Sequence, residues 1–367
     1  MVVLEYRPCS VVQFGRDVPD DKQQLTQRKA DHIRINLEND VQSRAHTGLG
    51  RYRFTHEALP ELDMALIDTR VSLFGRELSG PLLLSSMTGG TEQAMHINRN
   101  LARAAQHLGL VMGLGSMRAA IVQPASLPTF GVRDVAPNVM LFANIGAVQL
   151  NYGFTVEHCK RLVDLIEASA LILHLNPLQE AVQPSGDVNW AGLLSKIEAV
   201  VRGVGVPVIA KEVGWGISRR AAHALAGAGV AAIDVAGAGG TSWSQVELYR
   251  ADTDAQRRIA QAFDDWGIPT ADSIAAVKLA VPGLPIFASG GIANGVDGAK
   301  CIALGATLFG IARPLLRAAT LSVEAVIEEL NVVLGQLRVA MLCTGCPDMA
   351  ALGRTELIKD QQSSNNP

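Results

Sequence analysis

Short runs of apolar residues recur along the chain between residues 81 and 314, and each ends in glycine, serine, asparagine or a charged residue. Such runs carry apolar side chains on both faces, which is typical of strands buried in a parallel sheet. The pattern therefore predicts eight strands. They occupy residues 81–90, 110–118, 139–146, 170–177, 207–214, 231–240, 285–292 and 306–314.

Amphipathic segments lie between the apolar runs. Residues 218–230 and 296–306 are short examples with a glycine next to their last residue, as helices commonly have at their C-cap. Ser218 precedes the first of them and is a good N-cap candidate. Residues 91–110 form a longer segment, whose apolar side chains are spaced by three and four as on one helix face. These side chains are Ala94, Ile97, Leu101, Ala104 and Leu108.

Strands that alternate with helices fit either a (β/α)8 barrel or an open, doubly wound α/β sheet. Eight is the number of strands that closes a barrel, and polar residues gather at the carboxyl ends of the strands, where barrel active sites form. No GxGxxG motif follows the first strand, as it would in a dinucleotide-binding sheet. We therefore expect an α/β fold, a TIM barrel, over residues 76–340.

The remaining segments are expected to be additions to this barrel. Residues 1–75 are predicted to form an N-terminal extension that packs on and over the barrel. Residues 341–367 are predicted to form a C-terminal helical tail, and the polar end of this tail is expected to be disordered. The long gap between the sixth and seventh strands predicts a loop insertion over the barrel mouth at about residues 241–270.

The composition narrows the classes of function. The chain has 367 residues, of which 48% are hydrophobic and 18% charged, and its formal net charge is −3. That charge gives no electrostatic case for a nucleic-acid partner. No run of about 18 apolar residues suggests a membrane span, and the N-terminus lacks an apolar signal core. A cytoplasmic location is therefore expected.

The five cysteines are scattered, and their odd number and irregular spacing do not suggest a disulfide framework. Cys343 and Cys346 form an isolated CxxC motif. A structural zinc site would need a second pair or nearby histidines. A helix that ends at Gly345 is the simpler interpretation of this stretch.

Glycine-rich stretches lie at the ends of the last three predicted strands: residues 237–243, 288–292 and 310–314. Loops after strands seven and eight of a barrel, together with a helix N-terminus, commonly bind phosphate through backbone N–H groups. A single loop of this kind would more often be an ordinary turn. Three of them at the same end of the barrel predict a phosphate site.

The stretch "HLNPLQE" ends a strand that is otherwise apolar. Because side chains alternate along a strand, His174 and Asn176 share one face and should point toward the barrel mouth. Pro177 is expected to end the strand and begin a loop. Glu180 offers the oxygen ligand that Mg²⁺ prefers. The alternative for His174 alone is a hydrogen-bonded core residue.

Several cations are candidates for binding an anion. Lys211, at the end of the fifth strand, is a Schiff-base nucleophile, a fixed charge for an anionic cofactor, or a solvated strand-end lysine. Arg118 follows the second strand directly. Arg28 and Lys29 lie far upstream and would have to fold over the mouth; their spacing alone carries little weight.

Together these segments resemble type 2 isopentenyl-diphosphate isomerase, an FMN-dependent (β/α)8 enzyme. The stretches that carry the resemblance run in order from about residue 26 to residue 314, and "HLNPLQE" and "GAGGTSW" are the most specific. The first 25 or so residues and the polar tail have no counterpart in this family pattern. The full set is "RKADHI", "SSMTGG", "GSMR", "HLNPLQE", "AKEVG", "GAGGTSW", "SGGI" and "GIARP".

The resemblance implies a role for individual residues. Gln179 corresponds to the catalytic position beside the reacting carbons, and Glu180 to the Mg²⁺ ligand. The substrate-binding positions are Arg28, Lys29, Ser116, Met117, Arg118, His174, Asn176 and Gln179. The FMN-binding positions are Ser86, Met87, Thr88, Ser116, Asn144, Lys211, Thr241, Gly290, Gly291, Ala312 and Arg313.

The reaction implied by the resemblance is a 1,3-allylic proton shift that interconverts isopentenyl and dimethylallyl diphosphate for isoprenoid biosynthesis. No strong acid is obvious at the mouth, so reduced FMN would act as the acid–base catalyst. Mg²⁺ would hold the diphosphate, and NADPH would reduce the flavin. The resemblance also implies a homo-oligomer, a tetramer or octamer. If both Gln179 and Glu180 serve the site, the segment after Pro177 must be kinked, and we predict that it is.

Two other functions are compatible with the fold, since fold alone does not decide activity. The first is an FMN-dependent oxidoreductase, such as a 2-hydroxy-acid oxidase or an inosine monophosphate dehydrogenase. The oxidases would have arginine in "GGIR"-type loops, where this chain has "GGIAN", and the dehydrogenases would have cysteine in the loop 237–243. The second is a binding protein that kept the fold and lost its activity. The presence of all four residues of the motif argues against it: His174, Asn176, Gln179 and Glu180.

Overall fold

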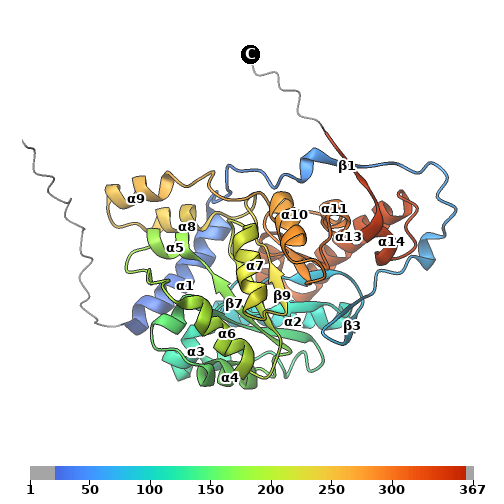
Figure 1. Ribbon diagram of the computed structural model, residues 1–367. Helices are drawn as coiled ribbons and strands as arrows, with labels where there is room; N and C mark the ends of the chain where they lie inside the picture. Colours follow the sequence, from blue (N-terminus) through green and yellow to red (C-terminus); the bar gives the residue numbers. More distant parts are fainter. Residues whose placement is uncertain (1–20, 361–367) are drawn as a thin grey trace, which may run out of the picture.

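The computed structural model describes residues 21–360, with side chains from residue 27 onward, and its centre is a closed barrel of eight parallel strands (Figure 1). The predicted TIM barrel is therefore confirmed, and each strand lies within one of the eight apolar runs. The strands are β4 (Leu82–Leu84), β5 (Val111–Gly113), β6 (Met140–Gly146), β7 (Ala170–Leu175), β8 (Val208–Glu212), β9 (Ala232–Asp234), β10 (Ile286–Ala288) and β11 (Leu308–Ile311).

The barrel interior is filled with apolar side chains near the amino ends of the strands. Phe142 and Phe287 stack there with ring centroids 6.2 Å apart. A short hairpin of β2 (Val71–Leu73) and β3 (Arg76–Leu78) closes this end by packing two leucines against the same cluster. With one end closed and apolar, only the carboxyl ends of the strands remain for a polar site.

Helices surround the barrel and bury the outward face of each strand. Leu171 and Leu173 of β7 pack in this outer layer, whereas Ile172 lies inside the barrel, as the alternation predicts. Thr91 and Ser218 cap α2 and α7. The helices are α2 (Glu92–Leu108), α4 (Val156–Leu165), α6 (Leu193–Gly203), α7 (Arg219–Gly227), α10 (Thr270–Ala280), α11 (Gly295–Leu304), α12 (Arg313–Leu321) and α13 (Val323–Leu342).

The segment between β9 and α10 was predicted to be a loop. It contains instead two helices, α8 (Trp243–Arg250) and α9 (Asp254–Gln261). Thr253 caps α9 through a capping box with Gln256, which gives this helix a defined start. The N-terminal helix α1 (Asp21–Glu38) packs against α8, which in turn packs against α9 (Figure 1).

The C-terminal region continues after α13 with α14 (Met349–Arg354) and β12 (Leu357–Lys359), which pairs with β1 (Tyr52–Phe54). Lys359 and Asp360, placed in the disordered tail by the sequence, therefore belong to ordered structure. The same prediction for residues 361–367 lies outside the described residues. Helix α13 ends at Leu342, just before Cys343, and the chain turns at Gly345.

None of the described helices combines the length and the apolar character needed to cross a membrane.

Candidate active site

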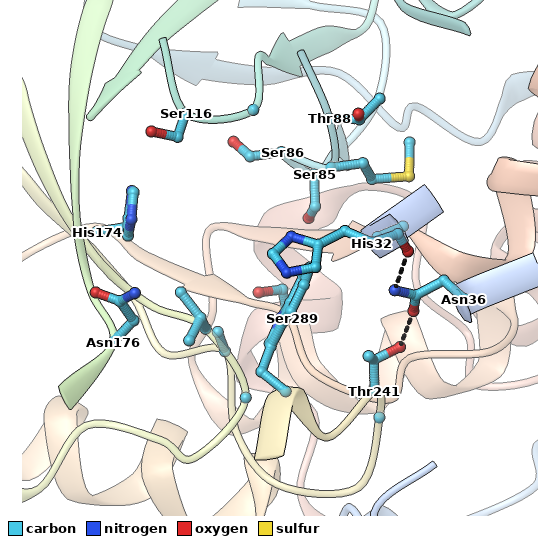
Figure 2. Close-up of a pocket in the computed structure, with 18 of the residues that line it drawn as sticks. His32, Asn36, Ser85, Ser86, Thr88, Ser116, His174, Asn176, Thr241 and Ser289 are labelled. Carbon is cyan, nitrogen blue, oxygen red and sulfur yellow. Dashed lines mark hydrogen bonds between the residues drawn. The ribbon is translucent and has the colours of Figure 1, made fainter. Parts of the chain in front are cut away.

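A cavity of about 550 Å³ lies at the carboxyl ends of the barrel strands. Polar side chains from separate strands and loops converge on it (Figure 2). It brings together nearly all the residues predicted for the site. Those that line it are Arg28, Lys29, Ser86, Met87, Thr88, Ser116, Arg118, Asn144, His174, Asn176, Gln179, Glu180, Lys211, Thr241, Gly290, Gly291, Ala312 and Arg313.

Met117 is the exception among the predicted residues. Its side chain is fully buried in the hydrophobic core, and it is not part of the cavity wall formed by the described residues. Its backbone N–H donates to the carbonyl oxygen of Asn144 at 2.7 Å. Met117 therefore connects the segment after β5 to strand β6 through its main chain, and its apolar side chain serves packing.

One side of the cavity is made of small residues and unpaired donors. Ser85 Oγ and Ser86 Oγ are buried and have no hydrogen-bond partner among the described residues. A Cβ on Gly240 would lie 2.5 Å from the backbone nitrogen of Gly291, so the two loops touch through their main chains. Helix α12 begins beside them with Arg313 and Pro314, and its N-terminal dipole together with the N–H of Arg313 favours an anion. This side fits the phosphate of a nucleotide cofactor.

Lys211 is held inside the barrel by two partners. Its Nζ lies 3.0 Å from Asp234 Oδ2 and donates to Ser289 Oγ at 3.3 Å. Ser289 Oγ in turn donates to Asp234 Oδ1 at 2.5 Å. All three residues are buried. The arrangement holds a positive charge at a defined place in the cavity wall and does not suit a mobile, solvated lysine.

His174 lies beside Lys211 across the β7–β8 ladder. Its Nδ1 is 2.7 Å from Asn144 Oδ1, and this hydrogen bond orients the imidazole ring. Burial lowers the pKa of His174 to about 3, and the charges of Lys211, Lys29 and Arg28 act in the same direction. The imidazole is therefore neutral in the free protein at neutral pH.

The segment after Pro177 is a helix, α5 (Pro177–Val182), and not the predicted loop. Proline is favourable in the first turn of a helix, where its missing N–H has no partner to lose. The turn brings Asn176 Nδ2 to 3.2 Å from Gln179 Oε1 and to 2.9 Å from Glu180 Oε1. The predicted departure from an extended chain is thus correct, although its form differs.

The carboxylate of Glu180 is buried and accepts several hydrogen bonds. Asn176 Nδ2 donates to Oε1, whereas Gln183 Nε2 and the backbone N–H of Asp187 donate to Oε2. Burial raises the pKa of Glu180, and the N–H of Asp187 and the charge of Arg28 oppose that rise. A carboxylate has about four lone-pair directions, so these bonds leave capacity for a cation.

Glu247 of α8 was not predicted and is central to the site. Its Oε1 accepts from Gln179 Nε2 at 3.0 Å and from His32 Nε2 at 3.0 Å, and its Oε2 lies 2.5 Å from Arg250 Nη1. Burial alone would raise the pKa of Glu247, but the bonds from His32, Arg250 and Gln179 lower it to about 2. A buried carboxylate therefore contacts Gln179, at a place where the sequence analysis predicted no acidic residue.

Three cations gather on the side of the cavity formed by α1 and α3 (Arg118–Val122). Burial, together with the charges of Arg28 and Arg118, lowers the pKa of Lys29 to about 7. Lys29 Nζ donates to the carbonyl oxygen of Ser116 at 2.7 Å. Cations that lower one another's pKa are stabilised when a polyanion binds between them.

Weak signals in the sequence could have indicated the missed residues. His32 lies inside the quoted stretch "RKADHI", and Asp234 is a charge at the end of a buried strand. Glu247 lies four residues after Trp243, which places both on one face of α8. Asp187 follows the Ser185–Gly186 turn. None of these positions differs by composition alone from an ordinary structural residue.

Residues 22–126 and 170–359 match the family model described as FMN-dependent dehydrogenase. This match covers more than half of the chain and, with the closed barrel, defines an FMN-dependent (β/α)8 protein. Solved structures agree on the fold. A mandelate oxidase with (S)-2-phenylpropionate has a TM-score of 0.64 and 19% sequence identity, over 92% of this chain and 98% of that one.

Curated relatives identify the particular family. The chain is 48% identical over 340 residues to the isopentenyl-diphosphate delta-isomerase of Rickettsia akari, covering 93% of this chain and 99% of the relative. It is 53% identical over 326 residues to that of Nostoc sp., covering 89% and 93%. The chain belongs to the isopentenyl-diphosphate delta-isomerases, in their FMN-dependent type 2 form.

Proposed function

We propose that this enzyme interconverts isopentenyl and dimethylallyl diphosphate by a 1,3-allylic proton shift, with FMN and Mg²⁺ bound in the cavity. The observation that carries the proposal is the division of the cavity into two anion-binding sides. Glycine loops and the start of α12 form one, and Arg28, Lys29 and Arg118 form the other. A cofactor phosphate and a diphosphate ester require two such sides.

FMN fits the side with the glycine loops. Gly290, Gly291, Ala312 and Arg313 would hold its phosphate, while Ser86, Met87, Thr88, Ser116, Asn144 and Thr241 would contact the rest. The buried hydroxyls of Ser85 and Ser86, which have no partner within the described part of the chain, need such a partner. Lys211 would stabilise negative charge on a reduced flavin. NADPH is the reductant that we propose. When bound in reduced form, FMN supplies proton exchange with the alkene.

The diphosphate fits the opposite side. Arg28, Lys29 and Arg118 would neutralise it, and His174 and Asn176 would bind its oxygens. Binding energy from this polar end would place the unreactive alkene at a defined position beside Gln179. The neutral amide of Gln179 cannot act as a strong base, so it orients the hydrocarbon end and the proton path.

Mg²⁺ fits Glu180 as a single protein ligand. No cluster of three or more His, Cys, Asp or Glu side chains within the described chain could form a metal site by itself. Mg²⁺ commonly keeps several waters and binds through one or two carboxylates together with substrate phosphates. Glu180 would therefore bind the ion together with the diphosphate.

Deuterium incorporation tests the proposal directly. With FMN, NADPH and Mg²⁺ in deuterated water, both isopentenyl diphosphate and its isomer should take up deuterium. NMR would measure this uptake. Gln179→Glu, Glu180→Gln and Lys211→Ala should each reduce turnover without unfolding the barrel, and chelation of Mg²⁺ should abolish it. Full activity in all three variants would contradict the assignment of these residues.

The second candidate is net oxidation by FMN, because the fold is shared with mandelate oxidase. It predicts oxygen consumption that depends on a 2-hydroxy acid and leaves isopentenyl diphosphate unlabelled. The proposal also includes a cytoplasmic location and a homo-oligomer, a tetramer or octamer. Light scattering after size exclusion would test the oligomeric state.

A further inference from the structure

The segment that follows α5 turns back onto Glu180 and ends in Asp187. Ser185 has a left-handed φ of 58°, and a Cβ on Gly186 would lie 1.8 Å from the carbonyl oxygen of Glu180. Because that neighbour is backbone, only glycine fits here. The turn places the backbone N–H of Asp187 so that it donates to Glu180 Oε2 at 2.7 Å.

The side chain of Asp187 connects two further loops. Its Oδ2 accepts hydrogen bonds from Arg118 Nη1 at 2.9 Å and from Gln149 Nε2 at 2.8 Å. Arg118 begins α3 after β5, Gln149 follows β6, and Glu180 lies in α5 after β7. Asp187 therefore joins the carboxyl ends of three consecutive barrel strands.

Asp187 is not part of the cavity wall that the described residues form, whereas Arg118, Gln149 and Glu180 are. The Arg118 and Asp187 side chains are only 19% and 17% exposed. A carboxylate at this place repels an anionic ligand, and the loss of water around the pair is unfavourable. Simple attraction of an anion therefore does not explain why an acid lies here.

Restraint of the arginine does explain it. A free arginine side chain has many rotamers, and it loses their entropy when it binds an anion. Arg118 in contact with Asp187 has already lost this freedom. A guanidinium presents five donors, and Arg118 lines the cavity as well as contacting Asp187, so one side chain can contact both Asp187 and a ligand.

We propose that Asp187 is a positioning residue for the diphosphate. It orders Arg118 toward the cavity before substrate binds, and its backbone N–H keeps the carboxylate of Glu180 in place. The inference rests on the proposed function, since it assumes that Arg118 binds a diphosphate. It concerns substrate binding and not the proton transfer near Gln179.

The test uses Asp187→Asn in the full-length, FMN-loaded protein. Asparagine keeps the size of the side chain and can still accept from Gln149, but it removes the charge that holds Arg118. Affinity for inorganic pyrophosphate with Mg²⁺, measured by calorimetry, should fall about tenfold. This is the lower end of the loss that follows when a residue that orients a binding group is mutated. KM for isopentenyl diphosphate should rise by a similar factor, while kcat stays within about twofold.

A double-mutant cycle with Arg118→Ala separates positioning from simple charge removal. Without Arg118, Asp187→Asn should leave pyrophosphate affinity unchanged or increase it, because only repulsion of the anion is then removed. Asp187→Glu, which keeps the charge, should recover part of the affinity. It also serves as the measurable variant if asparagine reduces the FMN content.

Asp134→Asn is the matched control, since Asp134 forms a pair with Arg99 at 2.6 Å on the protein surface. This control should bind pyrophosphate like the wild type. If Asp187→Asn binds pyrophosphate as well as or better than the wild type, or if glutamate restores nothing, the positioning role is wrong. If the wild-type protein itself binds no pyrophosphate, the proposed function fails instead.

Discussion

Glu247 orients Gln179 from outside the cavity. Its Oε1 accepts from both Gln179 and His32, and Arg250 balances its charge. Because a carboxylate only accepts, the amide of Gln179 must direct its nitrogen toward Glu247. The amide oxygen of Gln179 then accepts a hydrogen bond from Asn176 Nδ2. Both polar atoms of Gln179 are thus placed by neighbours.

Glu247→Gln should therefore impair the reaction more than it impairs binding. The new amide can donate as well as accept a hydrogen bond, so it no longer forces the nitrogen of Gln179 to face it. The side-chain amide of Gln179 can then rotate by about 180°. A small misplacement at a reacting centre can reduce rate by about 10²-fold. We expect kcat to fall by that order while KM stays similar, measured by steady-state assay. Glu157→Gln, on an exposed glutamate paired with Lys160, is the control.

Lys29 gives a residue-scale prediction for pH. Its pKa in the free protein is lowered to about 7, and a bound diphosphate would raise it. The complex then holds more protons than the free protein above pH 7, so the affinity for the anion should fall as pH rises beyond that value. The loss can reach about tenfold per pH unit.

Comparison with Lys29→Arg isolates this effect, since pyrophosphate itself titrates in the same range. Arginine stays charged, so the variant should show a shallower loss of pyrophosphate affinity above about pH 7. Identical pH profiles for the two proteins would mean that Lys29 does not titrate with binding.

At the scale of elements, the contact between the β9–α8 and β10–α11 loops sets the shape of the phosphate side. Gly240→Ala would place a Cβ 2.5 Å from the backbone nitrogen of Gly291. Backbone cannot rotate away as a side chain can, so the loops must separate. We expect FMN affinity to fall at least about tenfold, measured by flavin fluorescence, while the far-UV circular dichroism is retained.

Gly227→Ala is a suitable control for that variant. Gly227 is the last residue of α7, and an added Cβ meets nothing within 4 Å. The change should leave FMN affinity unaltered and stabilise the protein by up to about 1 kcal/mol. If Gly240→Ala also bound FMN normally, contact between the two loops would not shape the phosphate side.

Local patterns predicted the elements of the barrel well. The β7 run shows why: alternation alone placed Leu171 and Leu173 under the helices and Ile172 inside. The same reasoning mistook Pro177 for the start of a loop, because proline ends a strand and begins a helix equally well. The two helices of the β9–α10 segment were missed because the whole gap was interpreted as a loop, although Thr253 and Gln256 have the spacing of a capping box.

The site was predictable where polar residues end apolar strands, as at His174 and Lys211. It was not predictable where a partner comes from far along the chain. Glu247 lies 68 residues after Gln179 and 215 after His32, and only the folded barrel brings them together. Asp234 and Asp187 were missed for the same reason, because their partners Lys211 and Arg118 lie in other parts of the chain.

For the molecule as a whole, the buried neutral imidazole of His174 links stability to pH. Its folded-state pKa is lowered from 6.5 to about 3, so the unfolded chain binds more protons between these values. Stability should therefore fall as pH decreases through this range, by up to about 1.4 kcal/mol per pH unit. Urea unfolding of the ligand-free protein measures this slope.

His174→Gln should reduce that slope, since glutamine does not titrate. The remaining slope would belong to His32, whose pKa burial also lowers, and to carboxylates such as Glu247, whose lowered pKa makes it lose stabilisation only at more acidic pH. If the slope were unchanged in the variant, the pKa of His174 in the folded protein would not be lowered as its burial indicates.

The placement of α8 has a consequence for engineering this scaffold. The acid that orients Gln179 comes from a helix inserted between β9 and α10, whereas Gly290, Gly291, Ala312 and Arg313 lie after β10 and β11. Exchange of residues 243–261 for another segment would thus alter the reacting end and leave the nucleotide cradle in place. New chemistry could be selected on this barrel one loop at a time.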